Sequence, residues 1–171
     1  MKKFIPYGAL VLGVTLCLYS PIAKGIALYR QHRNVFVQAE NIGQIKIPKI
    51  AVDLPIYKGT DEEVLQNGIG CMVEGSSLGG AKSTHSILVG HRGLPHADLF
   101  KRLDELEIGD CFTLLVADKE LAYEVCSIQV IRPSDIKVFR VQEGRNLVSL
   151  VTCTPYGINT HRLVVTGERK E

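Results

Sequence analysis

The stretch Asn146-Leu-Val-Ser-Leu-Val-Thr-Cys153-Thr-Pro-Tyr-Gly-Ile-Asn-Thr-His-Arg162-Leu-Val-Val-Thr166 joins two apolar runs through a turn-rich middle. Short runs rich in Val and Leu are typical of buried strands, and Thr-Pro-Tyr-Gly supplies turn-forming residues between them. The stretch therefore predicts two buried strands joined by a loop. Cys153 ends the first strand and Arg162 opens the second, so both lie where a rigid sheet can present side chains to a cleft.

The rest of the chain from residue 43 onward also predicts mainly strands. Apolar residues recur with a period of two from Gln44 to Ile56, Ser83 to Val89 forms an apolar run, and two strands flank Asp118-Lys119. Further segments predict a short helix after Thr60, a helix from His96 to Leu106, and a loop with a possible short helix from Pro133 to Arg145. With seven or eight strands and no regular strand-helix alternation, we expect a mainly β fold, a mixed or closed β-barrel.

The two strands around Asp118-Lys119 predict a hairpin centred on that pair. This register puts Phe112, Leu114 and Val116 on one core-facing side, and it places Cys111 opposite Cys126 on the other side. A directly opposed pair lies within the reach of a disulfide, but a hydrogen-bonded pair aims its sulfurs less well. We therefore expect neighbouring, mostly reduced thiols.

The N-terminus predicts a membrane segment. An uncharged, mostly apolar run follows Lys2 and Lys3 and ends before Lys24, and its length matches the hydrocarbon core of a bilayer. A cleaved signal peptide is the alternative, but no convincing cleavage site is found. We expect residues 1–23 to be an uncleaved anchor, 24–42 a stalk, and 43–171 one globular domain. The basic residues on both sides of the run do not decide its orientation.

Composition excludes several classes of protein. The chain has 171 residues, of which 46% are hydrophobic and 22% charged, and a net charge of +2 with both signs interspersed, which gives no footprint for nucleic acid. The five cysteines form an odd set without a CxxC pair, which argues against a zinc ribbon or a dense disulfide framework. We expect no metal and no cofactor, and at least one unpaired thiol.

Cys153 is the candidate nucleophile. A cysteine at a strand end is ordinarily a small apolar residue that closes the core. His91, however, ends another apolar strand within Gly90-His91-Arg92-Gly93, and cysteine chemistry needs a proton-transfer partner. Arg162 would lie on the same rim, where a fixed cation lowers a thiol pKa and stabilises an oxyanion. His85 is interpreted as a packed or solvated histidine.

Two segments resemble the sortase family. Thr84-His-Ser-Ile-Leu-Val-Gly-His91-Arg-Gly-Leu-Pro95 resembles the sortase histidine segment, and Ser149 to Leu163 resembles its cysteine and arginine segment. Both are most similar to the class C, pilus-assembling branch. The resemblance implies a β-barrel of about eight strands, with Cys153, His91 and Arg162 as the catalytic residues.

The resemblance also implies a reaction and its partners. Cys153 would attack the Thr-Gly bond of an LPXTG-like sorting signal on a pilin or surface protein, His91 would protonate the departing amine, and Arg162 would hold the oxyanion. A pilin lysine or a peptidoglycan cross-bridge amine would then resolve the thioacyl enzyme. The domain would lie outside the cytoplasmic membrane. A cysteine hydrolase with the same residues and a non-catalytic pilus assembly factor remain as alternatives.

The sequence departs from the class C pattern at two points. No Asp-Pro-aromatic lid motif occurs between Lys24 and Gly43, and the chain ends at Glu171 without a second apolar segment. We therefore expect an active site without the usual lid. These departures leave open whether the product is a pilus or an anchored wall protein.

Overall fold

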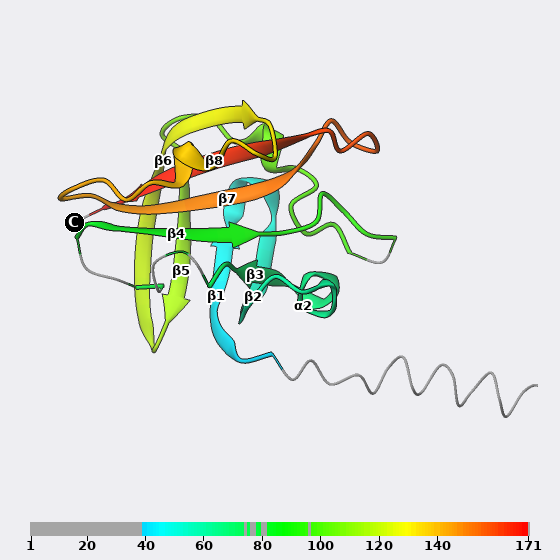
Figure 1. The fold of residues 1–171 in the computed structure, drawn as a ribbon. Coiled ribbons are helices and arrows are strands. Elements are labelled where there is room, and N and C mark those ends of the chain that lie inside the picture. Colours follow the sequence, from blue (N-terminus) through cyan, green and yellow to red (C-terminus); the bar gives the residue numbers. More distant parts are fainter. Residues whose placement is uncertain (1–38, 74, 76–77, 80–81, 96, 171) are drawn as a thin grey trace, which may run out of the picture. The chain divides into compact units, whose positions relative to one another are not determined.

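Eight strands close into a barrel in the computed structural model, which describes residues 39–73, 75, 78–79, 82–95 and 97–170 (Figure 1). The strands are β1 (Asn41–Ile47), β2 (Val52–Lys58), β3 (Ile69–Cys71), β4 (Thr84–Val89), β5 (Cys111–Val116), β6 (Lys119–Ile131), β7 (Asn146–Thr154) and β8 (His161–Arg169). Their order around the barrel is β1-β2-β3-β4-β7-β8-β6-β5. The predicted mainly β, closed barrel of about eight strands is confirmed.

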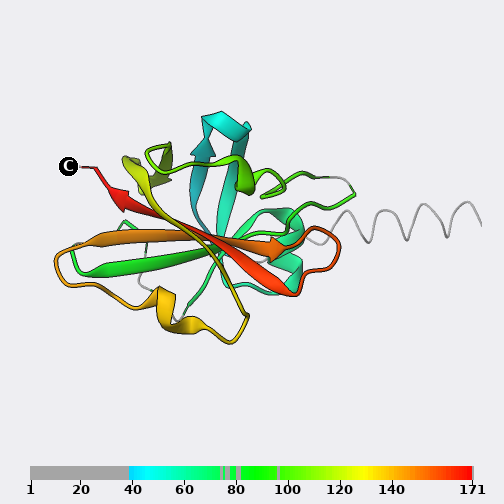
Figure 2. The same cartoon turned by 90° about the horizontal axis from the view of Figure 1, so that it is seen from above.

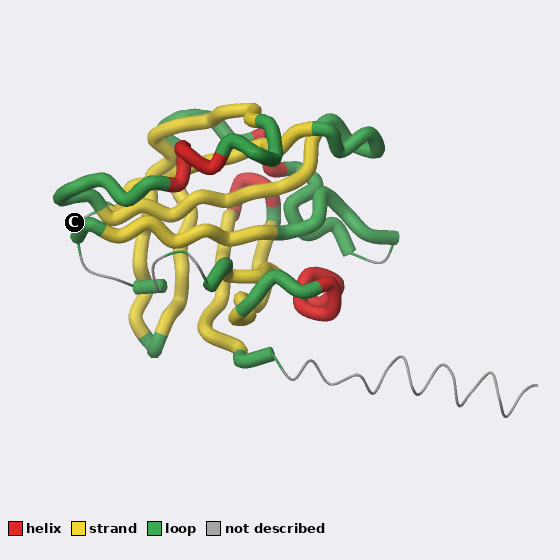
Figure 3. Tube along the Cα trace, viewed as in Figure 1, coloured by secondary structure: helices red, strands yellow, loops and turns green. Residues whose placement is uncertain are grey.

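The helices are short and lie outside the sheet (Figure 3). They are α2 (Glu62–Asn67) and three single turns of 3₁₀ helix, η1 (Pro48–Ile50), η2 (Leu103–Glu105) and η3 (Ile136–Phe139). The helix predicted after Thr60 is therefore present, and so is the short helix predicted in the loop before β7. Pro48 begins η1, where its fixed φ suits the first position of a helical turn.

The helix predicted from His96 to Leu106 is wrong. The described residues of this segment form turns and η2, because the backbone N–H groups bond three residues back or across the loop, as in Leu103 N to Phe100 O at 3.2 Å and Phe100 N to His91 O at 3.1 Å. Leu99 has a positive φ of 36°, which an α-helix does not contain. The apolar residues of this segment are nevertheless buried, so their spacing indicated that they are buried but not that they form a helix.

The hairpin register predicted for β5 and β6 is also wrong, by two residues. Cys111 lies opposite Glu124 and Leu114 lies opposite Leu121, because the turn is formed by Ala117 and Asp118, with φ of 47° and 61°. A shift of two residues keeps each side chain on its face, so the predicted core side is correct. Cys111 is exposed and does not oppose Cys126, and the four cysteines in the described part of the chain are free.

The sheet is buried on both faces around β4, β7 and β8. Inside the barrel, alternate residues such as Val148 and Leu150 join the main core, where the rings of Phe112 and Tyr123 stack at 5.4 Å. The outer face carries a second cluster of Ile87, Ile131, Val151 and Val164. Val138 and Phe139 cover that cluster from residues 132–145, the β6–β7 connection, which runs alongside β7 on the outside of the barrel (Figures 1 and 2).

Residues 1–38 lie outside the described part of the chain, and with them the predicted membrane segment 1–23 and most of the predicted stalk 24–42. Among the residues that are described, no helix combines the length and apolar character needed to cross a bilayer. The first strand of the barrel begins at Asn41.

Candidate active site

Cys153 and Arg162 are direct neighbours across the antiparallel pair of β7 and β8. Directly opposed residues of such a pair place their side chains on the same face of the sheet. That face is the outer one, because Val151 and Val164, the next opposed pair on the same side, belong to the outer cluster. Cys153 and Arg162 are both partly exposed. The register thus sets the two residues directly opposite each other on this face.

His91 reaches the same edge through the parallel pair of β4 and β7. The last aligned residues are Val89 and Val151, and Gly90 N still donates to Val151 O at 3.0 Å. His91 follows Val89 by two residues, as Cys153 follows Val151, and the next residue, Arg92, contacts Cys153 O and Thr154 Oγ1. Gly90 turns inward, where a Cβ would come within 2.7 Å of Ile69 and 2.8 Å of Phe100. Glycine is therefore needed for the strand to leave the barrel at this point.

Two backbone carbonyl oxygens that precede Arg162 hold its guanidinium in place. Arg162 Nη1 donates to Asn159 O at 3.1 Å and to His161 O at 3.0 Å, so both carbonyls fix one nitrogen of the guanidinium. A planar guanidinium that is fixed at one nitrogen keeps its other N–H donors in a defined direction. Such a group can hold an oxygen that gains negative charge.

A carboxylate faces the imidazole of His91. His91 Nε2 is buried and has no hydrogen-bond partner among the residues that the structure describes, and Glu62 Oε1 at the start of α2 lies 3.6 Å away. The Glu62 side chain is 69% exposed, so the contact is a solvated ion pair when the imidazole is protonated. Glu62 could not be selected from the sequence, because the approach of α2 to the end of β4 depends on the barrel.

Arg92 is a second cation at the site, and sequence reasoning did not single it out. Its side chain is only 11% exposed, and Nη2 contacts Asp104 Oδ2 at 2.6 Å. Nη1 donates to Thr154 Oγ1 at 2.7 Å and lies 3.5 Å from Cys153 O. Arg92 therefore ties the loop that carries His91 to the end of the strand that carries Cys153.

Arg92→Met should lower the free energy of unfolding by about 1–3 kcal/mol, because it removes two short hydrogen bonds of a nearly buried cation. Urea denaturation measures the change. Arg102→Met is the matched control: Arg102 contacts Glu105 at the same 2.6 Å, but both side chains are about half exposed, so we expect little change. Equal effects of the two substitutions would contradict the stabilising role of the Arg92 contacts.

The other candidate groups lie elsewhere. Cys71 is buried in the main core, where burial raises the pKa of its thiol, and Cys126 Sγ accepts from Arg145 Nη2 at 3.6 Å. A hollow of about 710 Å³ is lined by residues 40–44, 55 and 115–118 and shares no residue with the Cys153 edge. Within the described ranges, no three His, Cys, Asp or Glu side chains gather in a way that could hold a metal ion.

The arrangement brings all three predicted residues to one edge of β4, β7 and β8. A thiol, an imidazole and a guanidinium on one surface are the groups that acyl transfer through a thioester uses: a nucleophile, a proton-transfer group and an oxyanion partner. The chemistry that this edge can support is attack on a carbonyl carbon.

Comparison with known proteins gives the family. The sortase domain model matches residues 45–170. Sortase D of Bacillus subtilis (strain 168) is 32% identical over 130 residues, covering 74% of this chain and 63% of that protein. Sortase A of Streptococcus agalactiae is 31% identical over 133 residues, covering 74% of this chain and 52% of that protein. The chain thus matches less than two thirds of the length of these two relatives.

Comparison with solved structures gives the same family. Sortase C2 of pilus island 1 from group B Streptococcus has 46% identity and a TM-score of 0.76, with 77% of this chain and 75% of that chain covered. Sortase C1 from Streptococcus agalactiae has 47% identity and a TM-score of 0.75, with 77% and 68% covered. Since the family model matches residues 45–170, which include the edge that carries Cys153, the chain belongs to the sortase family and is similar to its class C members.

Proposed function

We propose that this protein is a cysteine transpeptidase that cleaves an LPXTG-like sorting signal between Thr and Gly and transfers the new carboxyl end to an amine. The observation that carries the proposal is the pairing of β7 with β8 and with β4. It sets Cys153 opposite Arg162 and sets the end of β4, two residues before His91, beside the same end of β7. Membership of the sortase family and similarity to enzymes named for pilus islands support the same reaction.

The first half of the reaction forms a thioester. The Cys153 thiolate attacks the threonine carbonyl carbon, and the carbonyl electrons move to oxygen, where the Arg162 guanidinium stabilises the negative charge. When the C–N bond breaks, the His91 imidazolium gives its proton to the leaving glycine amine. The products are a free glycine-containing tail and a thioacyl enzyme at Cys153.

The second half transfers the acyl group. A neutral amine attacks the thioester carbon, the C–S bond breaks, and the amine proton returns to His91 as Cys153 leaves as a thiolate. The proposed acceptor is a pilin lysine, which gives a pilus polymer, or the amine of a peptidoglycan cross-bridge, which gives an anchored wall protein. Similarity to a sortase C2 of a pilus island, and to a sortase C described by its pilin substrate specificity, favours the pilin lysine.

The proposed location is the outer surface of the cell membrane. The apolar run within residues 1–23 would anchor the chain, the stalk 24–42 would carry the barrel away from the bilayer, and the domain 43–171 would meet pilins or surface proteins after their export. The basic residues on both sides of the anchor leave its orientation to this functional argument.

Mass spectrometry of the purified protein with sorting-signal peptides and candidate amines tests the proposal. We expect an adduct on Cys153 whose mass equals the peptide truncated after threonine, and a transfer product that appears only when an amine is added. A hydrolase would instead release the free acid at the same rate with or without the amine. An assembly factor would bind the peptide and form no adduct, which would refute the proposal.

The missing lid motif gives a further prediction. A small alkylating reagent should modify Cys153 at similar rates in the full chain and in a chain that begins at Ala39, just before β1, because no Asp-Pro-aromatic plug precedes the barrel. Labelling followed by peptide mass mapping measures both rates. Marked acceleration after removal of residues 1–38 would show that the preceding segment covers the thiol.

A further inference from the structure

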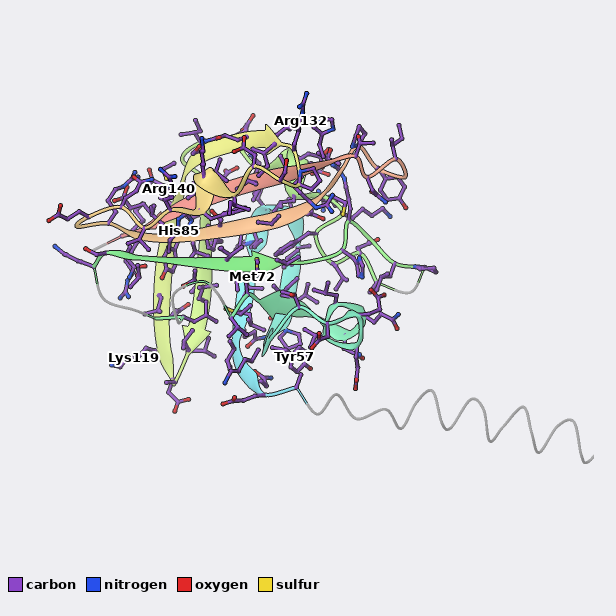
Figure 4. All side chains as sticks on the ribbon, viewed as in Figure 1. Tyr57, Met72, His85, Lys119, Arg132 and Arg140 are labelled. Atoms are coloured by element: carbon purple, nitrogen blue, oxygen red, sulfur yellow. The ribbon has the colours of Figure 1, made fainter. Side chains whose placement is uncertain are left out.

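His85 is a buried histidine on the same face of the sheet as Cys153. It lies in β4, six residues before His91, and only 1% of its surface is exposed. Its Nε2 lies 2.8 Å from Ser149 Oγ, and its Nδ1 lies 3.1 Å from the carbonyl oxygen of Arg140. Figure 4 shows His85 and Arg140 close together beside β7. The imidazole therefore links the sheet to the middle of the β6–β7 connection.

The contacts define the direction of each hydrogen bond. A carbonyl only accepts, so Nδ1 carries the proton and donates to Arg140 O, which leaves Nε2 to accept from the Ser149 hydroxyl. Ser149 Oγ in turn lies 2.8 Å from Thr166 Oγ1 and can accept from that hydroxyl. Burial, together with the charge of Arg145, lowers the pKa of His85 despite its bond to Arg140, in agreement with a neutral ring. One imidazole thus joins β4, β7 and β8 to the connection.

This link adds to the apolar packing of Val138 and Phe139 on the outer cluster, and further hydrogen bonds hold one end of the connection. At the end nearest β7, Thr84 N donates to Arg145 O at 3.1 Å and Gly144 N donates to Ser83 Oγ at 3.0 Å. At the other end, the chain continues from β6. Arg140 stands between these ends, next to Phe139, whose ring meets His85 edge-on at a centroid distance of 6.3 Å.

The central part of the connection borders the surface that leads to Cys153. Val138 and Phe139 pack on the outer cluster, which includes Val151 of β7. Val151 precedes Cys153 by two residues and lies on the same face of the strand. A shift of the connection therefore changes the wall beside the thiol. Ile136, the first residue of η3, and Val141, two residues after η3, are 70% and 54% exposed and are available to contact a bound peptide.

We propose that His85 is a positioning residue that fixes the β6–β7 connection against β4 and β7 and so sets the affinity for the sorting peptide. The inference rests on the proposed function and deepens it. His85 takes no part in bond making, because six residues of extended strand separate it from His91 by about 20 Å. Its loss should therefore act on KM and spare kcat.

His85→Phe tests this role, because phenylalanine keeps a ring of similar size and cannot form the hydrogen bonds to Arg140 O and Ser149 Oγ. With the sorting peptide we expect KM to rise about tenfold, equivalent to about 1.4 kcal/mol, while kcat stays within about twofold. His85→Gln, whose amide can both donate and accept, should recover part of the loss. A fall in kcat at unchanged KM, or an unchanged KM in a folded variant, would overturn the proposal.

Two further substitutions separate the hydrogen bonds from the side chains around them. Arg140→Ala retains the carbonyl that His85 binds, so KM should stay within about twofold of the wild type. Ser149→Ala removes only the hydroxyl that donates to Nε2, and we expect a smaller rise in KM. Ser149→Ala also tests the proposal if His85→Phe does not fold. A rise with Arg140→Ala as large as that with His85→Phe would overturn the assignment to the carbonyl.

Hydrogen–deuterium exchange tests the anchoring without any substrate. In His85→Phe, amides within residues 136–140 should exchange at least about fivefold faster, while those of the β5–β6 hairpin should keep their wild-type rates. Unchanged exchange at 136–140 would refute the anchor. If no sorting peptide reacts with the wild-type protein, the proposed function fails, and the exchange result still decides whether His85 holds the connection.

Discussion

Cys153→Ala is expected to abolish both thioacyl formation and transfer, because no other group at this edge can form the acyl intermediate. Removing the nucleophile of a covalent mechanism costs at least about 10⁴-fold in kcat, and here the residual rate should fall below detection. Intact-mass analysis with a sorting peptide measures the adduct, and product formation with an added amine measures transfer.

Three other cysteines provide the controls for this prediction. Cys111 is exposed, Cys126 lies in β6 where its pairing with β8 is irregular, and Cys71 is part of the core, so their alanine variants should keep most of the activity. Cys71→Ala should lower stability because it removes a buried side chain. Loss of the adduct in a folded variant of one of these three would count against Cys153 as the nucleophile.

Arg162→Lys is expected to lower kcat by about 10²-fold or more, although the charge is conserved. Arg162 Nη1 is held by the carbonyls of Asn159 and His161, which leaves the other N–H donors of the guanidinium for the substrate oxygen. A lysine ammonium has no second nitrogen, so it cannot occupy both positions together. Single-turnover formation of the thioacyl adduct measures the effect on the chemical step.

A conservative change at a surface arginine controls for this substitution. Arg132, at the start of the β6–β7 connection, is exposed, so Arg132→Lys should leave kcat within about twofold. Turnover near that of the wild type by Arg162→Lys would exclude the oxyanion role and leave Arg162 as a structural residue of the β7–β8 connection.

The strands could be predicted from the sequence because they are encoded locally. The period-two pattern before Ile56 and the Val-rich runs around Cys153 each give a strand at the expected place. The order of the strands could not be derived in this way, since the parallel pairing of β4 with β7 is set by contacts between distant residues. The resemblance to a family supplied the barrel that periodicity alone left as one of two alternatives.

Two local predictions, the helix from His96 to Leu106 and the position of the hairpin turn, were wrong because more than one backbone structure can bury the same apolar residues. Leu99, Phe100 and Leu103 are buried by successive turns rather than by one helix face. The hairpin turn uses Ala117 and Asp118 at positive φ, without the Asn-Gly or Asp-Gly signal that marks such turns. Its position was therefore assigned one residue too late.

The residues of the candidate site also divide into those that the sequence alone could select and those that only the folded barrel reveals. Cys153, His91 and Arg162 stand at ends of predicted strands, so the sequence could select them. Arg92 and His85 could not be assigned roles, because their importance lies in partners such as Thr154 and the Arg140 carbonyl, which only the folded barrel brings near. The sequence allowed His85 to be packed or solvated, and the structure decides for packed.

The parallel pairing of β4 with β7 also has a consequence for how the protein acquires its reactivity. The hydrogen bond from Thr152 Oγ1 to Gly90 O joins residues that are 62 positions apart, and the intervening chain includes all of β5 and β6. Contacts of such long range form only after a large loss of chain entropy, and they slow the folding of β proteins. A chain that has not completed its sheet therefore carries Cys153 without the end of β4 beside it. Under the proposed function, such a chain would not yet transfer acyl groups.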